Sequence, residues 1–424
     1  MRILIATDAF PPTSGGSGWS TYELARGLRA SGHHVVIVRT YSEREAAPSE
    51  YDGFVVRGFP AFAPRVPFLR NYVRNERLYK RLSAYLVEAI KSEKIDLIHA
   101  QHVLTGPASV GAAQHTGIPS ICTVRDYWPV CYWGDVLADP GAGILCPGCS
   151  ASAMTRCLRP RTGAAWPAAL PAIPYMRANL RRKQASLADA DAIVAVSEYV
   201  GTALRQRAPE FRRVRIEAIP NGVDVPGLSA DAAIEARPAS ERYAVFAGKL
   251  AKNKGAHALV ETAERARLDM PLVVIGDGPE RGSIENAAKA ARRDVRILGW
   301  RDRREVFRWL RHAEFLIFPS VWPEPLSRVL IEASALSVPI AAMNTGGTPD
   351  VIVHEETGLL STTVAGLAAD VARLASDAPL RARLGAAAAH RAASHFDIPV
   401  VIGRMEKLYR EVIADPRRKQ HATA

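Results

Sequence analysis

The sequence has no apolar run that approaches the roughly 20 residues of a membrane-spanning helix. Its first residues, 1–8, form only a short apolar run before Pro11 and Pro12, which predicts a first β-strand and not a signal peptide. Hydrophobic residues make up 48% and charged residues 23% of the chain, so a disordered protein is excluded apart from a polar tail at 416–421. We therefore expect a cytoplasmic globular protein, and 424 residues suffice for two domains.

Acidic residues are absent between Asp139 and Asp189, although the whole chain carries 43 of them against 55 basic residues. Basic and large apolar side chains alternate in this stretch: Arg156, Arg159, Arg161, Arg177, Arg181, Arg182 and Lys183 with Trp166, Leu170, Ile173, Tyr175 and Met176. Such a mixture could rest on the anionic inner face of the plasma membrane or hold an anionic lipid-linked acceptor. The alternative is a solvated arginine-rich surface. A nucleic-acid binder is disfavoured because no RNA- or DNA-binding motif accompanies the positive charge.

Cysteine is scarce, but four of the five cysteines cluster: Cys131, Cys146, Cys149 and Cys157. Disulfides are disfavoured in a reducing cytosol, and four thiolates could bind a structural zinc ion. The spacing matches no standard zinc-finger pattern, so free thiols in a loop remain the alternative.

Short apolar strands alternate with helical stretches in both halves of the chain, which predicts parallel βαβ units. The expected strands are 2–6, 34–39, 54–57, 96–100, 119–124 and 192–196 in the first half, and 243–247, 272–275, 295–298, 314–319 and 339–342 in the second. We expect one doubly wound, Rossmann-like domain at 1–215 and a second at 216–395. Residues 396–424 are expected to form a helix that can cross back to the first domain, followed by the polar tail. In doubly wound sheets ligands bind at the carboxyl ends of the strands, so two such domains facing each other would form a catalytic cleft.

The segment from Trp322 to Glu332 carries the most specific chemical signal. Two prolines hold Glu324 extended, and Ser327 is a suitable N-cap for a helix at 327–336. Backbone N–H groups at such a helix start can bind a phosphate or sugar hydroxyls, and Glu332 would lie roughly 7 Å further along the axis. This separation suits Glu324 for hexose hydroxyls and Glu332 for a ribose diol. Two solvent-facing glutamates are the alternative.

In its context this segment resembles the E-x7-E motif of family 4 of the retaining glycosyltransferases, which have the GT-B architecture of two Rossmann-like domains. The resemblance extends over nearly the whole chain, through the segments 11–16, 220–224 and 346–350. It implies transfer of a hexose from a nucleotide diphosphate sugar to a hydroxyl of a glycan or lipid-linked acceptor, in cell-envelope or exopolysaccharide synthesis. It further implies that the anomeric configuration is retained and that the leaving phosphate helps to deprotonate the acceptor. By the same resemblance, the domain at 1–215 is expected to bind the acceptor and the domain at 216–395 the nucleotide sugar.

The resemblance also implies donor-binding roles for Lys249 and Lys254, which follow the first strand of the second half. Similar enzymes use cations here to bind the donor diphosphate, so that no divalent metal cofactor is required. Leu326 and Ser327 are expected to add donor contacts. Ordinary surface lysines are the alternative.

The expected first domain contributes glycines and polar side chains. Gly15 and Gly16 occupy the place of the glycine loop that closes over the donor phosphates in the family. Many relatives carry His where this chain has Arg125, close to the transferred sugar. An arginine is a poor acid or base, but it can hydrogen-bond a sugar or phosphate, so Arg125 is kept as a candidate catalytic residue. Further candidates for acceptor or sugar contacts are His99, His102 and Asp126, and for the two histidines packing at a strand end is an equal alternative.

Other interpretations are less favoured. Asp189 and Asp191 match the D-x-D string of metal-dependent transferases, but they immediately precede an apolar strand, which favours a simple boundary signal. A sugar-nucleotide epimerase of the same fold would need a dedicated acid and base carboxylate. A sugar phosphorylase would need a pyridoxal phosphate lysine, and an inert partner subunit would not need an intact donor motif.

Overall fold

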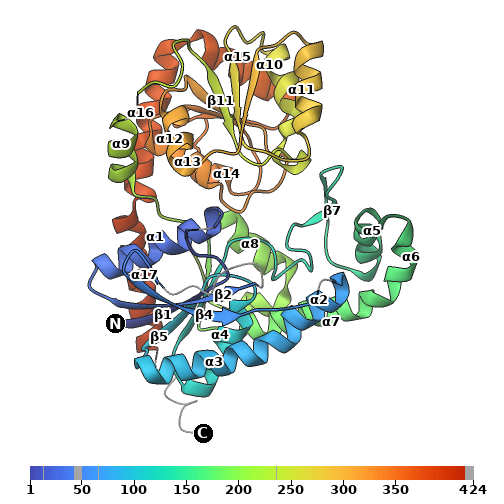
Figure 1. Ribbon diagram of the computed structural model, residues 1–424, viewed down its shortest axis with the longest axis vertical. Coiled ribbons are helices and arrows are strands. Elements are labelled where there is room, and N and C mark those ends of the chain that lie inside the picture. Colours follow the sequence, from blue (N-terminus) through green and yellow to red (C-terminus); the bar gives the residue numbers. More distant parts are fainter. Residues whose placement is uncertain (13, 43–49, 65, 235, 416–424) are drawn as a thin grey trace. The chain divides into compact units, whose positions relative to one another are not determined.

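The computed structural model describes residues 1–12, 14–42, 50–64, 66–234 and 236–415. The chain divides into two compact units (Figure 1). Unit 1 comprises Met1–Val136, Cys146–Gly222 and the chain from Ile398 onward, and unit 2 comprises Leu137–Leu145 and Val223–Asp397. The expected boundaries after residues 215 and 395 therefore lie a few residues too early.

Unit 1 is built on an eight-stranded sheet with the order β10-β9-β6-β5-β1-β2-β4-β3. Its strands are β1 (Arg2–Thr7), β2 (His34–Tyr41), β3 (Glu50–Tyr51), β4 (Phe54–Pro60), β5 (Leu97–Ala100), β6 (Ser120–Val124), β9 (Ala192–Ala195) and β10 (Ile216–Ala218). All neighbours are parallel except β3 and β4. The chain order reverses between β1 and β5, which defines a topological switch point.

Helices cover both faces of this sheet, as the near-continuous apolar strands require. On one face, Ile3 and Ile5 of β1 pack against helices α1 (Gly16–Ala30) and α17 (Ile398–Ala414). On the other face, Leu4 and Ala6 pack against α3 (Leu78–Glu93) and α4 (Thr105–Thr116). Helix α17 presents an apolar stripe to this core, which includes Val401, Met405, Leu408 and Val412, and so belongs to unit 1.

Two further helical segments complete unit 1. Helix α2 (Pro67–Tyr72) runs through a π-helical turn, Val73–Arg77, into α3. Helices α5 (Ala151–Thr162), α6 (Trp166–Ala169) and α7 (Ile173–Ala188) enclose a small core of their own. Helix α8 (Glu198–Arg207) follows β9.

Unit 2 contains a six-stranded parallel sheet with the order β13-β12-β11-β14-β15-β16. The strands are β11 (Ala244–Ala247), β12 (Leu272–Ile275), β13 (Val295–Gly299), β14 (Phe315–Phe318), β15 (Ile340–Met343) and β16 (Leu359–Ser361). Counted along the chain, this is the 3-2-1-4-5-6 order of the Rossmann fold, with its switch point between β11 and β14. The sequence predicts all of these strands except β16.

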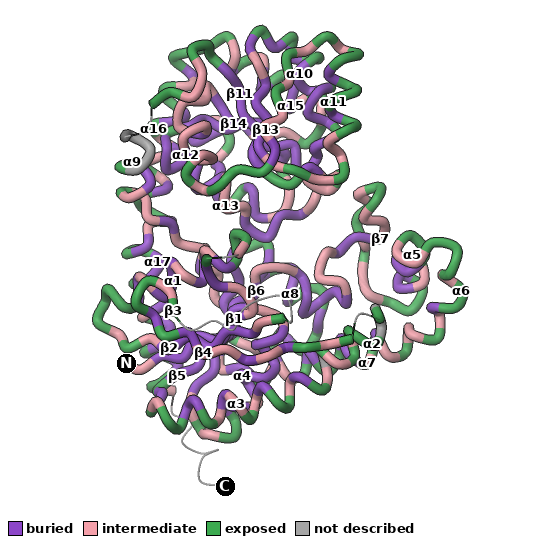
Figure 2. Tube along the Cα trace, viewed as in Figure 1, coloured by how far each residue is buried: buried purple, intermediate pink, exposed green. Residues whose placement is uncertain are grey.

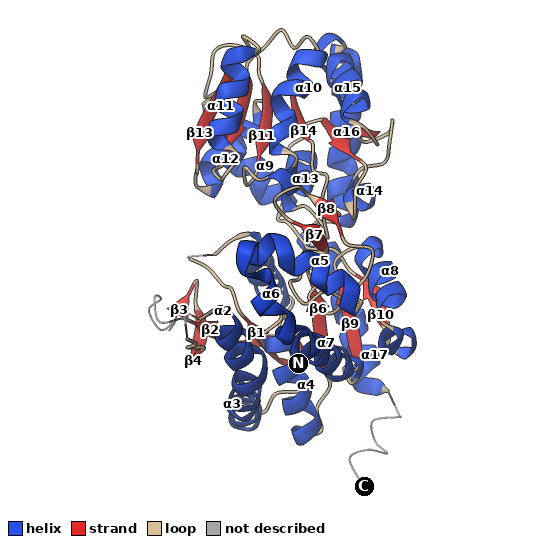
Figure 3. Ribbon diagram, turned by 90° about the vertical axis from the view of Figure 1, so that its right-hand side faces the viewer, coloured by secondary structure: helices blue, strands red, loops and turns tan. Residues whose placement is uncertain are grey.

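Helices flank the unit 2 sheet (Figure 3). Helices α10 (Leu259–Arg265), α11 (Arg281–Ala290), α15 (Val364–Ser376) and α16 (Ala378–His395) contribute to one core with alternate residues of the strands. The remaining helices are α9 (Val225–Ile234), α12 (Arg303–Arg311), α13 (Arg328–Ala335) and α14 (Thr348–Val351), and a short hairpin of β7 (Leu137–Asp139) and β8 (Ile144–Leu145) is grouped with this unit. The central strands of both units are buried (Figure 2). None of the described helices is long and apolar enough to span a membrane.

Candidate active site

The switch point of unit 2 brings together the residues predicted to bind the donor. Lys249 and Lys254 follow the carboxyl end of β11, and the segment that contains Glu324 follows the carboxyl end of the neighbouring strand β14. Ligands bind at this position in doubly wound sheets because the connections diverge there and leave a crevice. Lys249 is exposed, whereas Glu324 is only 3% exposed.

Glu324 is held by two side chains from different segments. The Lys254 Nζ atom donates to Oε1 at 2.7 Å and to Oε2 at 2.8 Å, and the Ser320 hydroxyl donates to Oε1 at 2.7 Å. The Lys254 ammonium also lies 4.7 Å from the centroid of the Trp322 ring, within reach of a cation–π interaction. A buried carboxylate requires such partners, so Glu324 and Lys254 form one ionic unit. The alternative of solvent-facing glutamates is wrong.

A glycine turn packs directly on the backbone of Glu324. Gly347 donates its N–H to the Glu324 carbonyl at 2.6 Å. Gly346 has φ +56°, and a Cβ atom there would lie 2.4 Å from both the N and the O atoms of Glu324. Only glycine fits this left-handed position and this close approach. The turn therefore sets the position of Glu324 in the site.

Glu332 lies in the middle of α13 and is 8% exposed. Its Oε1 atom accepts a hydrogen bond from Arg328 Nε at 2.8 Å, and Arg303 Nη2 lies 3.8 Å from the same oxygen. Two guanidinium groups thus fix the carboxylate at the helix. Ser327 occupies the N-cap position of α13 as predicted, but its side chain makes no capping hydrogen bond, and Leu326 before it is buried.

The switch point of unit 1 gathers polar groups at the ends of β1 and β5. His102 Nδ1 lies 3.0 Å from Thr7 Oγ1 and accepts from the Asp8 N–H at 3.3 Å, while Asp8 Oδ2 accepts from the Leu104 N–H at 3.1 Å. Burial raises the pKa of Asp8 to about 7 and lowers the pKa of His102 to about 3. Asp8 was missed by the sequence reasoning, although its place directly after the first strand is the signal that could have found it.

Asp126 follows β6 at the same edge of the sheet. Its Oδ1 accepts from the Trp128 N–H at 2.8 Å, and burial raises its pKa to about 6. Lys183 of α7 is buried and electrostatically favours the charged form of Asp126. Asp126 is therefore tied into its own loop, and its contact with an acceptor stays a prediction.

His99 is fully buried at the end of β5. Its two ring nitrogens are both within hydrogen-bond distance of side chains, Nδ1 at 2.6 Å from the Tyr409 hydroxyl of α17 and Nε2 at 2.7 Å from Thr123 Oγ1. Neither nitrogen is available to a ligand, so the structure favours packing over the predicted sugar contact. The position of His99 at a strand end is compatible with either sugar binding or packing. Only the contacts with α17 and β6 distinguish the two roles.

We expect His99→Gln to destabilise the protein, because it removes a buried ring and hydrogen bonds that join β5, β6 and α17. Burial lowers the pKa of His99 to about 3, below the usual 6.5, so in weak acid the unfolded state binds a proton that the folded state does not. The stabilising contribution of His99 is therefore lost as the pH falls below about 6.5. Urea unfolding should show a stability difference between wild type and variant that is roughly 2 kcal/mol smaller at about pH 5 than at about pH 7.5. A difference independent of pH would contradict a neutral buried His99.

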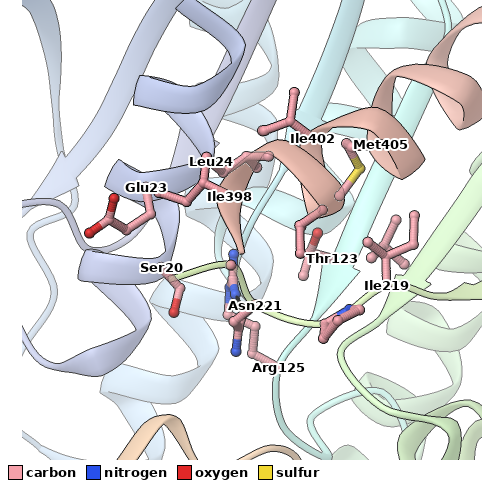
Figure 4. A pocket seen from close by; sticks show the side chains of 14 residues that line it. Ser20, Glu23, Leu24, Thr123, Arg125, Ile219, Asn221, Ile398, Ile402 and Met405 are labelled. Atoms are coloured by element: carbon pink, nitrogen blue, oxygen red, sulfur yellow. Dashed lines mark hydrogen bonds between the residues drawn. The ribbon is translucent and has the colours of Figure 1, made fainter. Parts of the chain in front are cut away.

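Arg125 lies in a pocket of unit 1 with an empty volume of about 350 Å³ (Figure 4). The pocket is lined by apolar side chains of α17, by Ser20, Glu23 and Leu24 of α1, and by the turn at 220–222. The Arg125 guanidinium donates to the side-chain oxygens of Asn221 and Gln101. Arg125 thus anchors the turn at which the chain leaves unit 1, and a role in sugar binding stays a prediction.

Gly15 is the N-cap of α1, and Gly16 is its first residue. Gly15 has φ −79°, which any residue can adopt, and a Cβ atom there would meet nothing within 4 Å. The fold of unit 1 therefore does not require glycine at residue 15. This fits the predicted close approach of a phosphate, which the structure does not test.

The remaining polar candidates have structural surroundings. Asp191 Oδ2 accepts from the Ser120 N–H at 2.8 Å at the start of β6, so the boundary interpretation of the D-x-D string is confirmed. Cys131 and Cys157 are buried, and burial together with the neighbouring thiols raises the pKa of Cys149 to about 12. Within the described residues, no group of three or more His, Cys, Asp or Glu side chains is placed to hold a metal ion. Structural zinc at these cysteines stays a prediction.

Comparison with known proteins gives two family matches that together cover both units. Residues 14–225, half of the chain, match the model of Glycosyltransferase Family 4, and residues 229–391 match that of Glycosyl transferases group 1. The chain belongs to glycosyltransferase family 4. It is accordingly a glycosyltransferase with the GT-B arrangement of two Rossmann-like domains.

Individual relatives of this family 4 glycosyltransferase are distant. The chain is 24% identical to glycogen synthase of Mycobacterium tuberculosis over 431 residues, which cover 96% of this chain and 94% of the relative. Among solved structures, sucrose-phosphate synthase of Thermosynechococcus elongatus aligns with a TM-score of 0.72 at 20% identity, covering 98% of this chain and 100% of that one. Anabaena Alr3699/HepE in complex with UDP aligns with a TM-score of 0.68 at 18% identity, covering 97% and 100%. The structural matches show a shared fold.

Proposed function

We propose that this enzyme transfers a hexose from a nucleotide diphosphate sugar to a hydroxyl of a glycan or lipid-linked acceptor, with retention of the anomeric configuration. The observation that carries the proposal is the buried Glu324–Lys254 pair at the switch point of unit 2, with Glu332 fixed on the helix that follows. A buried ion pair is weak evidence for stability, because desolvation offsets much of its Coulomb energy. Its place at the ligand-binding edge of a Rossmann sheet favours a functional role.

Each residue of the donor site has a distinct proposed role. Lys249 and Lys254 bind the diphosphate and stabilise the negative charge that develops on the leaving nucleotide, so that a metal ion is not needed. Glu324 accepts hydrogen bonds from hexose hydroxyls, and Glu332 accepts them from the ribose diol. Leu326, Ser327 and the first turn of α13 complete the surface that meets the sugar and phosphates.

The acceptor roles rest on unit 1. His102 and Asp126, with the newly located Asp8, lie on the carboxyl side of its sheet, where a ligand is expected. The resemblance to retaining enzymes of family 4 supports front-face substitution, in which a donor phosphate oxygen takes the acceptor proton. The bond from the anomeric carbon to the diphosphate breaks while the bond to the acceptor oxygen forms on the same face. Synthesis of a cell-envelope glycan or an exopolysaccharide is the proposed setting.

Binding of a nucleotide diphosphate should raise the melting temperature of the purified protein. A ligand at about 100 times its Kd stabilises the folded state by about 2.7 kcal/mol, which corresponds to several degrees for units of this size. Thermal-shift titrations with UDP, GDP, ADP and their sugar conjugates would measure this, and UDP is the first probe because it is bound in the similar Anabaena structure. Failure of all three series to stabilise the protein would contradict the donor site.

The same titrations locate the site. Glu332→Ala should abolish the nucleotide-dependent shift while the unliganded protein still unfolds cooperatively, since the ribose contact is lost and the backbone of α13 is unchanged. Glu285→Ala is a suitable control because Glu285 is an exposed glutamate on α11 of the same unit. An unaltered shift in Glu332→Ala would mean that the ribose site lies elsewhere.

A further inference from the structure

Large hydrophobic side chains are exposed in one short segment of unit 1. Phe62, Val66, Leu69 and Tyr72 are exposed by 45%, 61%, 48% and 41%, and they are four of the eleven large hydrophobic residues recorded as exposed among the described residues. The other seven are spread over the rest of that part of the chain. Clustered exposed apolar groups mark an interaction surface more often than scattered ones do.

The same segment carries exposed positive charge. Arg70, Arg74 and Arg77 are all exposed, and they follow one another at helical spacing through α2 and the π-helical turn. Between residues 62 and 81 the sequence has six basic residues and a single acidic one, Glu76. Glu76 is paired with Arg182 of α7 at 2.5 Å and accepts from the Asn179 amide at 2.9 Å, so its charge is offset locally.

Helix α7 extends the basic surface beside α2 (Figure 1). The rings of Tyr72 and Tyr175 lie 6.0 Å apart, which places the two helices in contact. Arg177 and Arg181 of α7 are exposed and are four residues apart, so they lie on one side of the helix. We call the surface formed by these two arginines and the exposed residues Phe62, Val66, Leu69, Arg70, Tyr72, Arg74 and Arg77 the α2–α7 face.

The structure assigns only part of the acid-free stretch at 139–189 to the interior, and contact of the stretch with a membrane stays a prediction. Met176 and Lys183 are buried in that stretch, and Arg161 is paired with Asp135 at 2.7 Å. Part of its basic and apolar content therefore forms an internal core. The exposed apolar groups lie instead on α2 and the residues before it, which the sequence analysis did not single out.

We propose that the α2–α7 face docks on a membrane that contains anionic phospholipids. Arginines would bind the headgroup phosphates, while Val66, Leu69 and their neighbours enter the boundary between headgroups and acyl chains. A bilayer fits better than a protein partner because the face combines a row of cations with protruding apolar side chains and shows no charge of the opposite sign that is left uncompensated. This inference does not depend on the proposed sugar-transfer function.

Vesicle co-sedimentation of the full chain tests the proposal. We expect binding to vesicles of phosphatidylcholine with about 30% phosphatidylglycerol, no binding to pure phosphatidylcholine, and a bound fraction that falls with added salt. Arg70→Glu with Arg77→Glu should weaken binding at least about tenfold, since each basic residue near an anionic surface contributes about fivefold. Val66→Asp with Leu69→Asp should abolish the binding that survives in high salt. Asp at position 66, the N-cap of α2, is compatible with helix formation.

Matched control variants test whether the loss of vesicle binding is specific to the α2–α7 face or follows from any change in surface charge or hydrophobicity. Val55→Asp replaces a valine that is 67% exposed on β4, and Arg212→Glu with Arg213→Glu reverses two exposed charges near α8; both should bind like the wild type. An equal loss of vesicle binding in the control variants, or binding to neutral vesicles, would overturn the proposal.

The proposal would also be overturned if the protein bound heparin tightly through Arg70 and Arg77 and the Val66 and Leu69 substitutions had no effect on vesicle binding. The face would then be a site for polyanions. An unchanged thermal shift with nucleotide in the α2 variants shows that the donor site is intact.

Discussion

Lys254→Ala is expected to lower the turnover of sugar transfer at least about 10²-fold and to abolish stabilisation by nucleotide diphosphates. The substitution removes a cation proposed to bind the diphosphate and leaves Glu324, which is 3% exposed, without its ionic partner. An unpaired buried carboxylate should also destabilise unit 2 by about 1–3 kcal/mol, less than for a fully buried pair because the Lys254 side chain is 29% exposed. Steady-state kinetics with the donor found by thermal shift, and urea unfolding, measure the two effects.

Two further variants show whether the effects of Lys254→Ala are specific to this lysine and to its pairing with Glu324. Lys252→Ala removes an exposed lysine from the same short turn and should leave turnover and nucleotide binding unchanged. Lys254→Ala combined with Glu324→Gln should recover part of the lost stability, because the stranded charge is gone, but not the turnover. Normal turnover in Lys254→Ala would show that the ion pair is structural and that the diphosphate is bound by other groups.

Gly346→Ala is expected to reduce turnover by about 10²-fold or more and to destabilise the protein by roughly 2–3 kcal/mol. Its Cβ atom would lie 2.4 Å from the backbone of Glu324, so that the chain carrying this carboxylate must move. The backbone at φ +56° adds strain for any residue other than glycine. Kinetics and thermal unfolding of the purified variant would report both losses.

Gly282→Ala is the matched control for this substitution. Gly282 lies in α11, where an added Cβ meets nothing within 4 Å, and alanine favours a helix by up to about 1 kcal/mol over glycine. We expect unchanged turnover and equal or slightly higher stability. Wild-type activity in Gly346→Ala would show that the turn adapts without displacing Glu324.

The grouping of the candidate donor-site residues at one edge of the sheet was largely predictable, because these residues are close in sequence to the strand ends that position them. Lys249 and Lys254 follow one predicted strand, and Glu324 follows the next strand in the sheet. The pattern of buried strands separated by turns thus places these three residues at the carboxyl edge of the unit 2 sheet. The bond from Ser320 to Glu324 and the approach of Arg303 to Glu332 were not predicted. These two contacts form only in the folded chain, and no local sequence pattern indicates them.

The roles of the polar residues in unit 1 were less predictable, because they too depend on contacts with distant segments. His99 follows the sequence rule for a ligand-binding strand end, yet its ring bonds to Tyr409, 310 residues further along the chain. Arg125 was predicted to lie near the sugar, but in the structure its guanidinium donates to Asn221 and Gln101. Whether a polar side chain at a strand end meets a ligand or a distant helix depends on what packs above it.

By itself the sequence determined that the chain is a family 4 glycosyltransferase with two Rossmann-like domains, and it predicted that the segment with Glu324 and Glu332 binds the donor. The apolar strands, the turn residues and the motif spacing are local properties, so short stretches of the sequence are enough to identify them. The tertiary structure alone decided that Lys254 and Glu324 form a buried pair, that α17 completes the core of unit 1, and that the exposed apolar groups lie on α2. Burial and pairing depend on which distant segments exclude water from a side chain, and that is a property of the folded chain.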